Sequence, residues 1–186
     1  MKESFQKKEP AIEIMEAVQV DVPGIEEVLY RTWLATYPNE EFGITIDDIE
    51  DRFKNRMSKE ILEKRKKYIA SHSINELALV AKKAGKVVGF CRVIRREDKN
   101  ELLAIYVLPE HQGRGVGKLL WQRAKYFFDS GKNTIVQVAV YNEKAIRFYE
   151  KLGFCDTGKR RSDEKFRMKS GSIIPELEMV IKARKK

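Results

Sequence analysis

The sequence predicts a single α/β domain built on a mixed, largely antiparallel sheet that is flanked by helices. Its 186 residues suffice for one domain with a sizeable core, and 42% of them are hydrophobic. Short β-type runs alternate with segments of helical periodicity, without an internal repeat or a linker. No apolar run reaches the ~18–20 residues that a membrane span needs. We expect a domain over residues 11–186, preceded by a frayed N-terminus of residues 1–10, and no membrane partner.

The N-terminal third reads as a strand followed by helices. Residues 11–20 alternate weakly and predict the first strand. Asp21 is placed to cap a helix that has Pro23 in its first turn and ends near Tyr37. Residues 45–71 are helical again, as two helices. Their inner face is expected to carry six apolar residues, Ile46, Ile49, Phe53, Met57, Ile61 and Leu62.

Strands dominate the remainder of the chain. They are expected at residues 77–80, 87–94, 102–107, 134–140, 154–159 and 175–181. The first two flank the polar turn of residues 82–86 and form a hairpin. A helix over residues 116–130 is predicted to end at Gly131, and a second helix, capped by Asn142, is predicted to end at Gly153.

Charge and cysteine content narrow the class of protein. The formal net charge is +9, but the basic residues are spread along the chain without zinc-ligand spacing or a recognition-helix pattern. A basic surface that faces an anionic cofactor explains this charge more simply than nucleic-acid binding, so no nucleic acid is expected as a partner. Two cysteines are too few to suggest a disulfide framework, and the polar N-terminus lacks the apolar segment of a secretory signal peptide. Both observations favour a reducing, cytoplasmic setting.

The most informative stretch is residues 105–120, where a β-type run ends at Pro109 and a glycine-rich loop leads directly into a helix. Glycines let a ligand approach the backbone, and a helix N-terminus presents unpaired N–H groups that suit a phosphate. Arg114 and Lys118 add formal positive charge. We interpret this loop as a cradle for a pyrophosphate.

Spacing excludes the two common nucleotide motifs. A dinucleotide fingerprint needs a glycine at position 118, where this chain has lysine. A Walker A loop needs glycine at 112 and Ser or Thr at 119, where this chain has glutamine and leucine. What remains is Gln-x-x-Gly-x-Gly, Gln112 to Gly117, behind a strand reading Leu-x-x-Ile-Tyr-Val-x-Pro. This pattern resembles the coenzyme A signature of the GNAT superfamily of acetyl-CoA-dependent N-acetyltransferases.

A second segment resembles the same superfamily. Asn142 to Phe154 reads Asn-x-x-Ala-x-x-Phe-Tyr-x-x-Leu-Gly-Phe and follows the first motif after about thirty residues, in the order typical of the superfamily. Taken alone, these residues describe a capped helix with an aromatic stripe and a glycine stop. The resemblance covers residues 77–154 well and the N-terminal third in outline. It implies a GNAT-like sheet in which a splayed strand pair forms the coenzyme A cleft.

The resemblance implies acetyl-CoA as co-substrate and assigns its contacts. Ile105, Tyr106 and Val107 would offer backbone groups to the pantetheine arm, with an N–H near Val107 facing the thioester carbonyl. The loop residues of the cofactor site would be Gln112, Gly113, Arg114, Gly115, Val116, Gly117 and Lys118, with residues 113–118 holding the pyrophosphate. Asn142 would bond the pantetheine. Tyr149 would lie near the sulfur, where its hydroxyl can protonate the departing thiolate.

The attacking amine must be neutral, and deprotonating a lysine-like amine at pH 7 costs about 4–5 kcal/mol. Glu101 stands eleven residues before Gln112, a spacing that resembles the catalytic glutamate of histone-type members. A water relay, with Glu101 as a solvated acid, stays open. Gln137 occupies a position where N-terminal-peptide acetyltransferases often carry a glutamate, which counts against a peptide acceptor. Neither histidine has a metal-ligand partner at a useful spacing, so no metal is expected.

The acceptor is less constrained. Trp33-x-x-x-Tyr37 resembles members that acetylate small amines, including polyamine acetyltransferases, and six acidic residues follow between positions 40 and 51. An aromatic wall beside carboxylates would suit a cationic amine, whereas a core Trp33 with solvent-facing acids is the plainer interpretation.

We therefore expect direct transfer, in a ternary complex, from acetyl-CoA to a primary amine, a small molecule such as a polyamine. The alternatives are a protein or peptide acceptor and a non-catalytic, coenzyme A-binding regulatory module. Neither cysteine lies in a motif that suggests an acyl-enzyme. The sequence is compatible with a homodimer.

Overall fold

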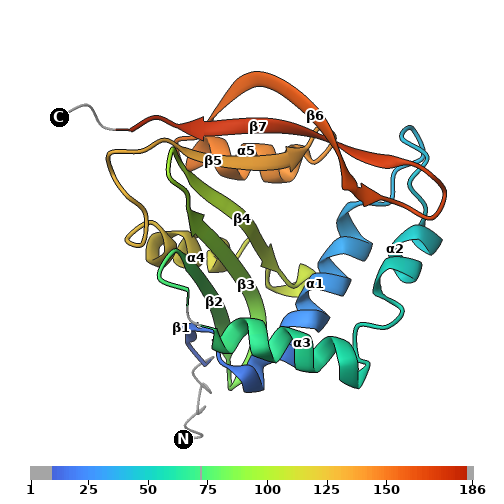
Figure 1. Cartoon of the computed structure of the whole chain (residues 1–186), viewed down its shortest axis with the longest axis horizontal. Coiled ribbons are helices and arrows are strands. Elements are labelled where there is room, and N and C mark those ends of the chain that lie inside the picture. The colour runs from blue at the N-terminus through green and yellow to red at the C-terminus, as the bar shows by residue number, and fades with distance from the viewer. Residues whose placement is uncertain (1–9, 72, 184–186) are drawn as a thin grey trace, which may run out of the picture.

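The computed structural model describes residues 10–71 and 73–183 (Figure 1). The elements in chain order are β1 (Ile12–Glu16), the 3-10 turn η1 (Gln19–Asp21), α1 (Val22–Thr36), α2 (Ile46–Phe53), α3 (Lys59–Ala70), β2 (Glu76–Lys83), β3 (Lys86–Arg95), β4 (Asn100–Val107), the 3-10 turn η2 (Pro109–His111), α4 (Val116–Ala124), β5 (Thr134–Ala139), α5 (Glu143–Lys151), β6 (Cys155–Arg167) and β7 (Ile173–Ile181). The predicted α/β class and the predicted sequence of strands and helices are confirmed.

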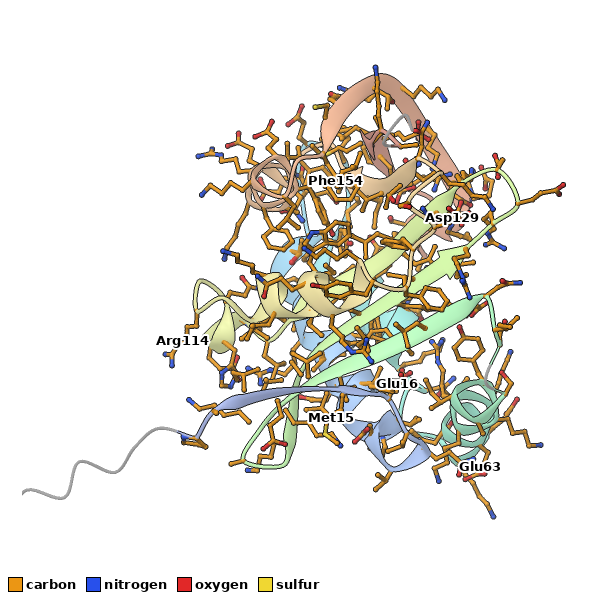
Figure 2. The ribbon with its side chains drawn as sticks, turned by 90° about the vertical axis from the view of Figure 1, so that its left-hand side faces the viewer. Met15, Glu16, Glu63, Arg114, Asp129 and Phe154 are labelled. Atoms are coloured by element: carbon orange, nitrogen blue, oxygen red, sulfur yellow. The ribbon has the colours of Figure 1, made fainter. Side chains whose placement is uncertain are left out.

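The strands form one sheet of seven, in the order β1-β2-β3-β4-β5-β7-β6. All neighbours are antiparallel except β4 and β5, which run parallel. Helices α1, α2 and α3 cover one face, and α4 and α5 cover the other, as the two perpendicular views show (Figures 1 and 2). The result is a three-layer domain with the sheet in the middle.

Two hydrophobic clusters hold the layers together. The larger one joins the sheet to α4 and α5, with Leu79, Leu102 and Leu120 fully buried. Burying one such side chain contributes about 1.5–3 kcal/mol. The smaller one lies under α1 and α2 and is built around Trp33 and Phe53. The predicted apolar face of residues 45–71 is therefore present in part.

Strands β4 and β5 pair over only three residues, from Asn100↔Thr134 to Leu102↔Val136, and then diverge (Figure 1). The fully buried Asn100 stabilises the end at which β4 and β5 are paired. Its side-chain NH₂ donates to the Asp129 carbonyl at 2.8 Å, and its side-chain oxygen accepts from the Asp129 N–H at 3.1 Å. Just beyond, Leu103 is an extra residue on β4, since Val93 pairs with Leu102 but Arg92 pairs with Ala104. A bulge bends the strand that carries it. The predicted splayed strand pair is confirmed.

Some boundaries differ from the sequence-based prediction. The helix predicted over residues 116–130 ends at Ala124. The strand predicted at 154–159 extends to Arg167, because its mostly exposed polar residues carry no alternating pattern that would reveal it. Asp21 stands at the N-cap of α1, but its carboxylate accepts from the Val18 N–H instead of capping the helix.

Two residues of the predicted inner helical face are exposed: Ile46 by 56% and Met57 by 50%. Ile46 is the first residue of α2, directly after its cap Thr45, and Met57 lies in the turn between α2 and α3. Of the predicted frayed segment 1–10, all but Pro10 lies outside the described residues. Across the described helices, none combines the length and the apolar character required to cross a membrane.

Candidate functional site

The gap between β4 and β5 contains a pocket of about 450 Å³. The start of α4, the helix α5 and the end of α1 complete its wall. Twelve of the residues singled out in the sequence line it: Tyr37, Ile105, Tyr106, Val107, Gln112, Gly113, Gly115, Val116, Gly117, Lys118, Asn142 and Tyr149. Three others do not line it, namely Arg114, Glu101 and Trp33. Two motifs separated in the chain thus meet around one pocket.

The backbone of β4 presents polar groups to this pocket. The Leu108 N–H donates to the Val88 carbonyl at 2.9 Å. Because bonded and non-bonded pairs alternate along an antiparallel ladder, the next pair, Gly89↔Val107, is of the wide, non-bonded kind, and so is Cys91↔Ile105. The N–H and C=O groups of Ile105 and Val107 therefore point away from β3, toward the side where β5 has diverged. An extended ligand could pair with them as an added strand does.

The glycines of the loop have separable roles. Gly113 and Gly115 have φ of +72° and +83°, and a Cβ on either would meet nothing within 4 Å. They supply a left-handed backbone and leave the space beside it open. A Cβ on Gly117 would instead lie 3.2 Å from Cζ of Phe148, so this glycine lets α4 approach α5.

Gly115 is the N-cap of α4 and provides no side-chain cap, so the first N–H groups of this helix find no capping side chain in the part of the chain that the structure describes. These donors, the helix dipole and the charge of Lys118 make the loop suitable for a phosphate. Arg114 lies at the tip of the loop, exposed, with its side chain directed away from the body of the protein (Figure 2). Its position makes it a surface charge beside the pocket.

Gln112 and Asn142 are both engaged with the protein. The Gln112 side-chain amide donates to the Val107 carbonyl at 2.9 Å, and its oxygen accepts from Nζ of Lys144 at 2.5 Å. Gln112 thus ties the loop to the end of β4 and to α5. The Asn142 oxygen caps α5 by accepting from the Ala145 N–H at 3.1 Å, which leaves its NH₂ group without an acceptor among the described residues. That NH₂ group can donate to a molecule in the pocket.

Three tyrosines lie at the inner end of the pocket. Tyr149 is only 6% exposed, and its hydroxyl has no hydrogen-bond partner in the described part of the chain. Burial, reinforced by the neighbouring Tyr106, raises the pKa of Tyr149 well above its usual value, so the hydroxyl keeps its proton. The hydroxyls of Tyr37 and Tyr106 are 3.2 Å apart, and burial raises the pKa of both.

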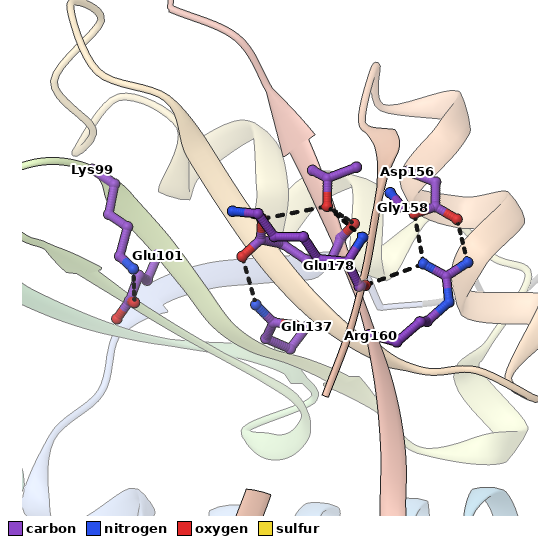
Figure 3. A network of polar contacts seen from close by, with 9 residues as sticks. Lys99, Glu101, Gln137, Asp156, Gly158, Arg160 and Glu178 are labelled. Atoms are coloured by element: carbon purple, nitrogen blue, oxygen red, sulfur yellow. Dashed lines mark hydrogen bonds and ion pairs between the residues drawn. The ribbon is translucent and has the colours of Figure 1, made fainter. Parts of the chain in front are cut away.

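Glu101 lies on the closed part of the β4–β5 pair, before the bulge (Figure 3). Its carboxylate is bound by Nε of Arg96 at 2.9 Å and by Nζ of Lys99 at 3.4 Å. Gln137, two residues beyond the β5 partner of Glu101, does line the pocket and donates to Glu178 at 3.2 Å. Its Oε1 is buried without a partner among the described residues, so an N–H of a bound molecule would satisfy it.

Trp33 lies in the smaller hydrophobic cluster and is 6% exposed. Its ring centroid is 4.5 Å from that of Tyr37 and 5.5 Å from that of Phe53. None of the six acidic residues at positions 40–51 lines the pocket. The buried Asp48, for example, accepts from the N–H of Thr45, the cap of α2, at 2.9 Å and from the Ser170 N–H at 2.8 Å. The aromatic and acidic residues that suggested a cationic acceptor are therefore not brought together around it.

Some pocket residues were missed by the sequence reasoning. Lys144 and Phe148 both line the pocket, four residues apart on one face of α5. Helical periodicity counted from Asn142 does not identify them, because residues two and six positions further along a helix lie on a different face. No set of three or more His, Cys, Asp or Glu residues within the described ranges is positioned to bind a metal.

Comparison with known proteins gives a consistent result. The model of the acetyltransferase (GNAT) family matches residues 29–154. Over 79 residues the chain is 38% identical to an uncharacterized N-acetyltransferase of Methanocaldococcus jannaschii, covering 38% of this chain and 35% of that protein. Over 85 residues it is 34% identical to one of Mycobacterium tuberculosis, covering 44% of this chain and 54% of that protein. The matches thus span about half or less of these curated relatives.

Solved structures resemble nearly the whole chain. The PaiA N-acetyltransferase from Thermoplasma acidophilum, in complex with coenzyme A, has a TM-score of 0.67 and 27% identity, covering 92% of this chain and 99% of that one. The ribosomal-protein-S18-alanine N-acetyltransferase from Escherichia coli has a TM-score of 0.64 and 18% identity, covering 95% and 96%. The second likeness concerns the fold alone.

Proposed function

The chain belongs to the acetyltransferase (GNAT) family and is an acetyl-CoA-dependent acyltransferase; from this premise we propose that it acetylates a primary amine of a small molecule. The amine attacks acetyl-CoA directly, while both substrates are bound. The observation that carries this proposal is the pocket between β4 and β5, which joins the exposed backbone edge of β4 to the N-terminus of α4.

The residues present fit coenzyme A. Gly113 and Gly115 leave open space where a diphosphate would approach backbone N–H groups. The backbone of Ile105 and Val107 would pair with the pantetheine arm. The amide groups of that arm would accept from the NH₂ group of Asn142 and donate to the unpartnered Oε1 of Gln137. These groups lie along one continuous pocket, which supports a cofactor that extends from the loop to the three tyrosines.

In the reaction the amine nitrogen bonds to the acetyl carbonyl carbon, the carbon–sulfur bond breaks, the nitrogen loses a proton and the sulfur gains one. The N–H of Val107, directed into the gap, is the candidate donor to the carbonyl oxygen as negative charge develops on it. One such donor is worth about 3–4 kcal/mol. Because Val107 is held in β4 by its neighbours, this donor needs no reorganisation during the reaction.

Tyr149 is the candidate proton donor to the sulfur. Its hydroxyl is buried, unpartnered among the described residues and protonated, because burial raises its pKa. A thiol ordinarily has a pKa of about 8.5, so a phenol with a raised pKa binds its proton more tightly than the sulfur does. Tyr149 therefore acts chiefly as a hydrogen-bond donor to the developing thiolate. The proton that the amine loses accounts for the proton that the sulfur finally gains.

The proton acceptor for the amine is water in our proposal. Glu101 as a base stays a prediction, and its ion pairs with Arg96 and Lys99, together with its position outside the pocket lining, favour water instead. A water relay needs only a solvent path to the amine. The polyamine acceptor likewise stays a prediction, since the acidic residues that suggested it line neither this pocket nor the second one described below.

The test uses the purified chain, acetyl-CoA and a panel of primary amines. We expect acetyl-CoA to bind, and thiol release to depend on an amine, with the acetylated amine detected by mass spectrometry. Absence of acetyl-CoA binding would overturn the proposal. Binding without thiol release for every amine and for N-terminal peptides would instead support a non-catalytic, coenzyme A-binding module.

A further inference from the structure

A second cavity, of about 620 Å³, lies on the α1–α3 side of the sheet. Its walls are α1, α2, α3, the strands β3 and β4 and the end of β6, which are gathered on one side of the molecule in Figure 1. It shares Leu103, Ala104 and Tyr106 with the cofactor pocket. The two spaces therefore border the same bulged part of β4, and this second cavity is of a size that holds a small molecule.

The charged residues that line this cavity are mostly basic. They are Arg52, Arg56, Arg65, Arg92 and Lys165, with Glu26 as the one acidic residue. Three of these positive charges are compensated at short range. Arg65 binds Glu26 at 2.9 Å, Arg92 binds Glu76 at 3.0 Å and Lys165 binds Asp163 at 2.7 Å.

Arg52 and Arg56 differ from the other three. Arg52 forms no ion pair with any residue of the described ranges, and its polar contact is a 3.0 Å hydrogen bond to the Lys165 carbonyl. The ion pair of Arg56 with Glu27 is long, at 3.7 Å, and its Nε, like that of Arg92, is buried without an acceptor among the described residues. A buried guanidinium nitrogen without an acceptor is a costly arrangement that a bound oxyanion would relieve.

Aromatic rings hold both guanidinium groups. Arg52 lies over Trp33 at 4.8 Å and over Phe166 at 5.6 Å, and Arg56 lies over Tyr30 at 3.9 Å. A guanidinium stacked on a ring keeps its in-plane N–H donors for a carboxylate or a phosphate, and it loses less conformational freedom on binding. The two residues are one turn of chain apart at the end of α2, so they can bind one acidic group together.

The position of Arg52 connects this charge to the reaction. Burial raises the pKa of the Tyr106 hydroxyl, and the hydrogen bond from Tyr37 and the positive charge of Arg52 oppose that rise. Arg52 thus acts electrostatically on a residue that both spaces share. Positive charge near an amine also favours its neutral, nucleophilic form. A polyamine would bring further ammonium groups against this mostly basic lining, which is unfavourable.

We propose that the acceptor is a small primary amine that carries an acidic group, a carboxylate or a phosphate, and that Arg52 and Arg56 bind this group while the amine lies at the β4 bulge. This inference rests on the proposed acetyl transfer and names the acceptor class for it. It reverses the charge that the sequence suggested for the acceptor.

The test compares four-carbon amines whose far end carries a carboxylate, a methyl group or a second ammonium group: 4-aminobutanoate, butylamine and 1,4-diaminobutane. Each of the three types is tested at several chain lengths. Spermidine and an aminoalkyl phosphate complete the panel. We expect kcat/KM to be at least about tenfold higher for the best acidic amine than for the best cationic one, as a charge-assisted hydrogen bond implies. A preference for the diamines or spermidine would overturn the inference.

Variants identify the residues responsible. Arg52→Gln and Arg56→Gln should each lower kcat/KM for the acidic amine about tenfold more than they lower kcat/KM for butylamine, mainly through KM. Arg123→Gln is the matched control, because Arg123 also has only a 3.7 Å contact with a glutamate, Glu16, but lies on α4 away from the cavity. Equal losses for all amines would contradict the assignment.

A binding measurement separates this inference from the acetyl transfer itself. With coenzyme A present, calorimetric titration should give tighter binding of the acidic amine than of the diamine, and Arg52→Gln should abolish the difference. If acetyl-CoA binds, no amine reacts and this binding preference is still found, the acetyl transfer fails and the anionic ligand class stands. If amines are acetylated but the acidic amine does not bind more tightly than the diamine, the proposed acidic acceptor is wrong and the proposed acetyl transfer stands.

Discussion

The cofactor pocket and the second cavity both border β4, but they differ in the residues that line them. On the α4–α5 side, the cofactor pocket is lined by one continuous stretch with three glycines and the backbone edge of β4, residues 103–118, and by residues of α5, β5 and the end of α1. On the α1–α3 side, the cavity consists of side chains from many separate elements, from Val22 to Phe166. A site made of backbone depends on few residue identities, whereas a site made of side chains can change its ligand while the fold stays the same. We therefore expect the recognition of acetyl-CoA and the recognition of the acceptor to be separable by mutation.

The largest effect is expected inside the cofactor pocket, at Tyr149. Tyr149→Phe removes the unpartnered hydroxyl at the inner end of the cofactor pocket and keeps the buried ring. We expect kcat to fall by about 100-fold, as for the loss of one hydrogen-bond donor to developing negative charge, with the dissociation constant of acetyl-CoA changed by less than about threefold. Steady-state kinetics and calorimetry measure the two quantities.

Tyr126→Phe is the control for this variant, because it makes the same chemical change on a side chain that is 78% exposed. It should leave both quantities unchanged. An unaltered kcat in Tyr149→Phe would remove the hydroxyl from the reaction and reduce Tyr149 to a packing residue.

A backbone site should be sensitive to backbone conformation, and two glycines test this. Gly115 in the cofactor loop and Gly85 in the β2–β3 turn have φ of +83° and +76°, and a Cβ on either meets nothing within 4 Å. Alanine costs about 1–2 kcal/mol in such a conformation. We expect both alanine variants to lower the melting temperature alike, but only Gly115→Ala to weaken acetyl-CoA binding, by about tenfold. Equal acetyl-CoA affinities in the two variants would contradict a backbone cradle.

The smallest effect is expected at Glu101, which lies outside both spaces and is bound by Arg96 and Lys99. Glu101→Gln should change kcat/KM by less than about threefold at every pH between 6 and 9. A catalytic base would be missed most at low pH, where hydroxide cannot replace it. A loss of about 100-fold that is greatest at low pH would therefore make Glu101 the base and exclude the water route.

The contrast between the two spaces also explains how far the sequence could be interpreted. The strand, the glycine loop, Gln112 and the following helix are neighbours in the chain, so local rules predict their joint geometry. The capped helix from Asn142 to Gly153 is local in the same sense, and its cap is observed. Their meeting across the β4–β5 gap follows from the resemblance to a family rather than from local rules.

The residues that line the second cavity form no comparable pattern in the sequence. Arg52 and Arg56 come from the end of α2 and the turn after it, Arg92 from β3 and Lys165 from β6, and no periodicity links them. Trp33 is aromatic and suitably spaced from Tyr37, but it packs in the smaller cluster against Phe53. The charge of the cavity depends on which arginines find a carboxylate nearby, and that pairing is set by long-range packing.

The central claim is that acetyl transfer occurs directly between two substrates bound on opposite sides of β4. Initial rates of thiol release, measured while acetyl-CoA and the best acidic amine are varied together, test it most directly. The account predicts double-reciprocal lines that intersect, because both substrates must be bound before the first product leaves. Parallel lines, together with an acetylated protein trapped from acetyl-CoA alone, would contradict it.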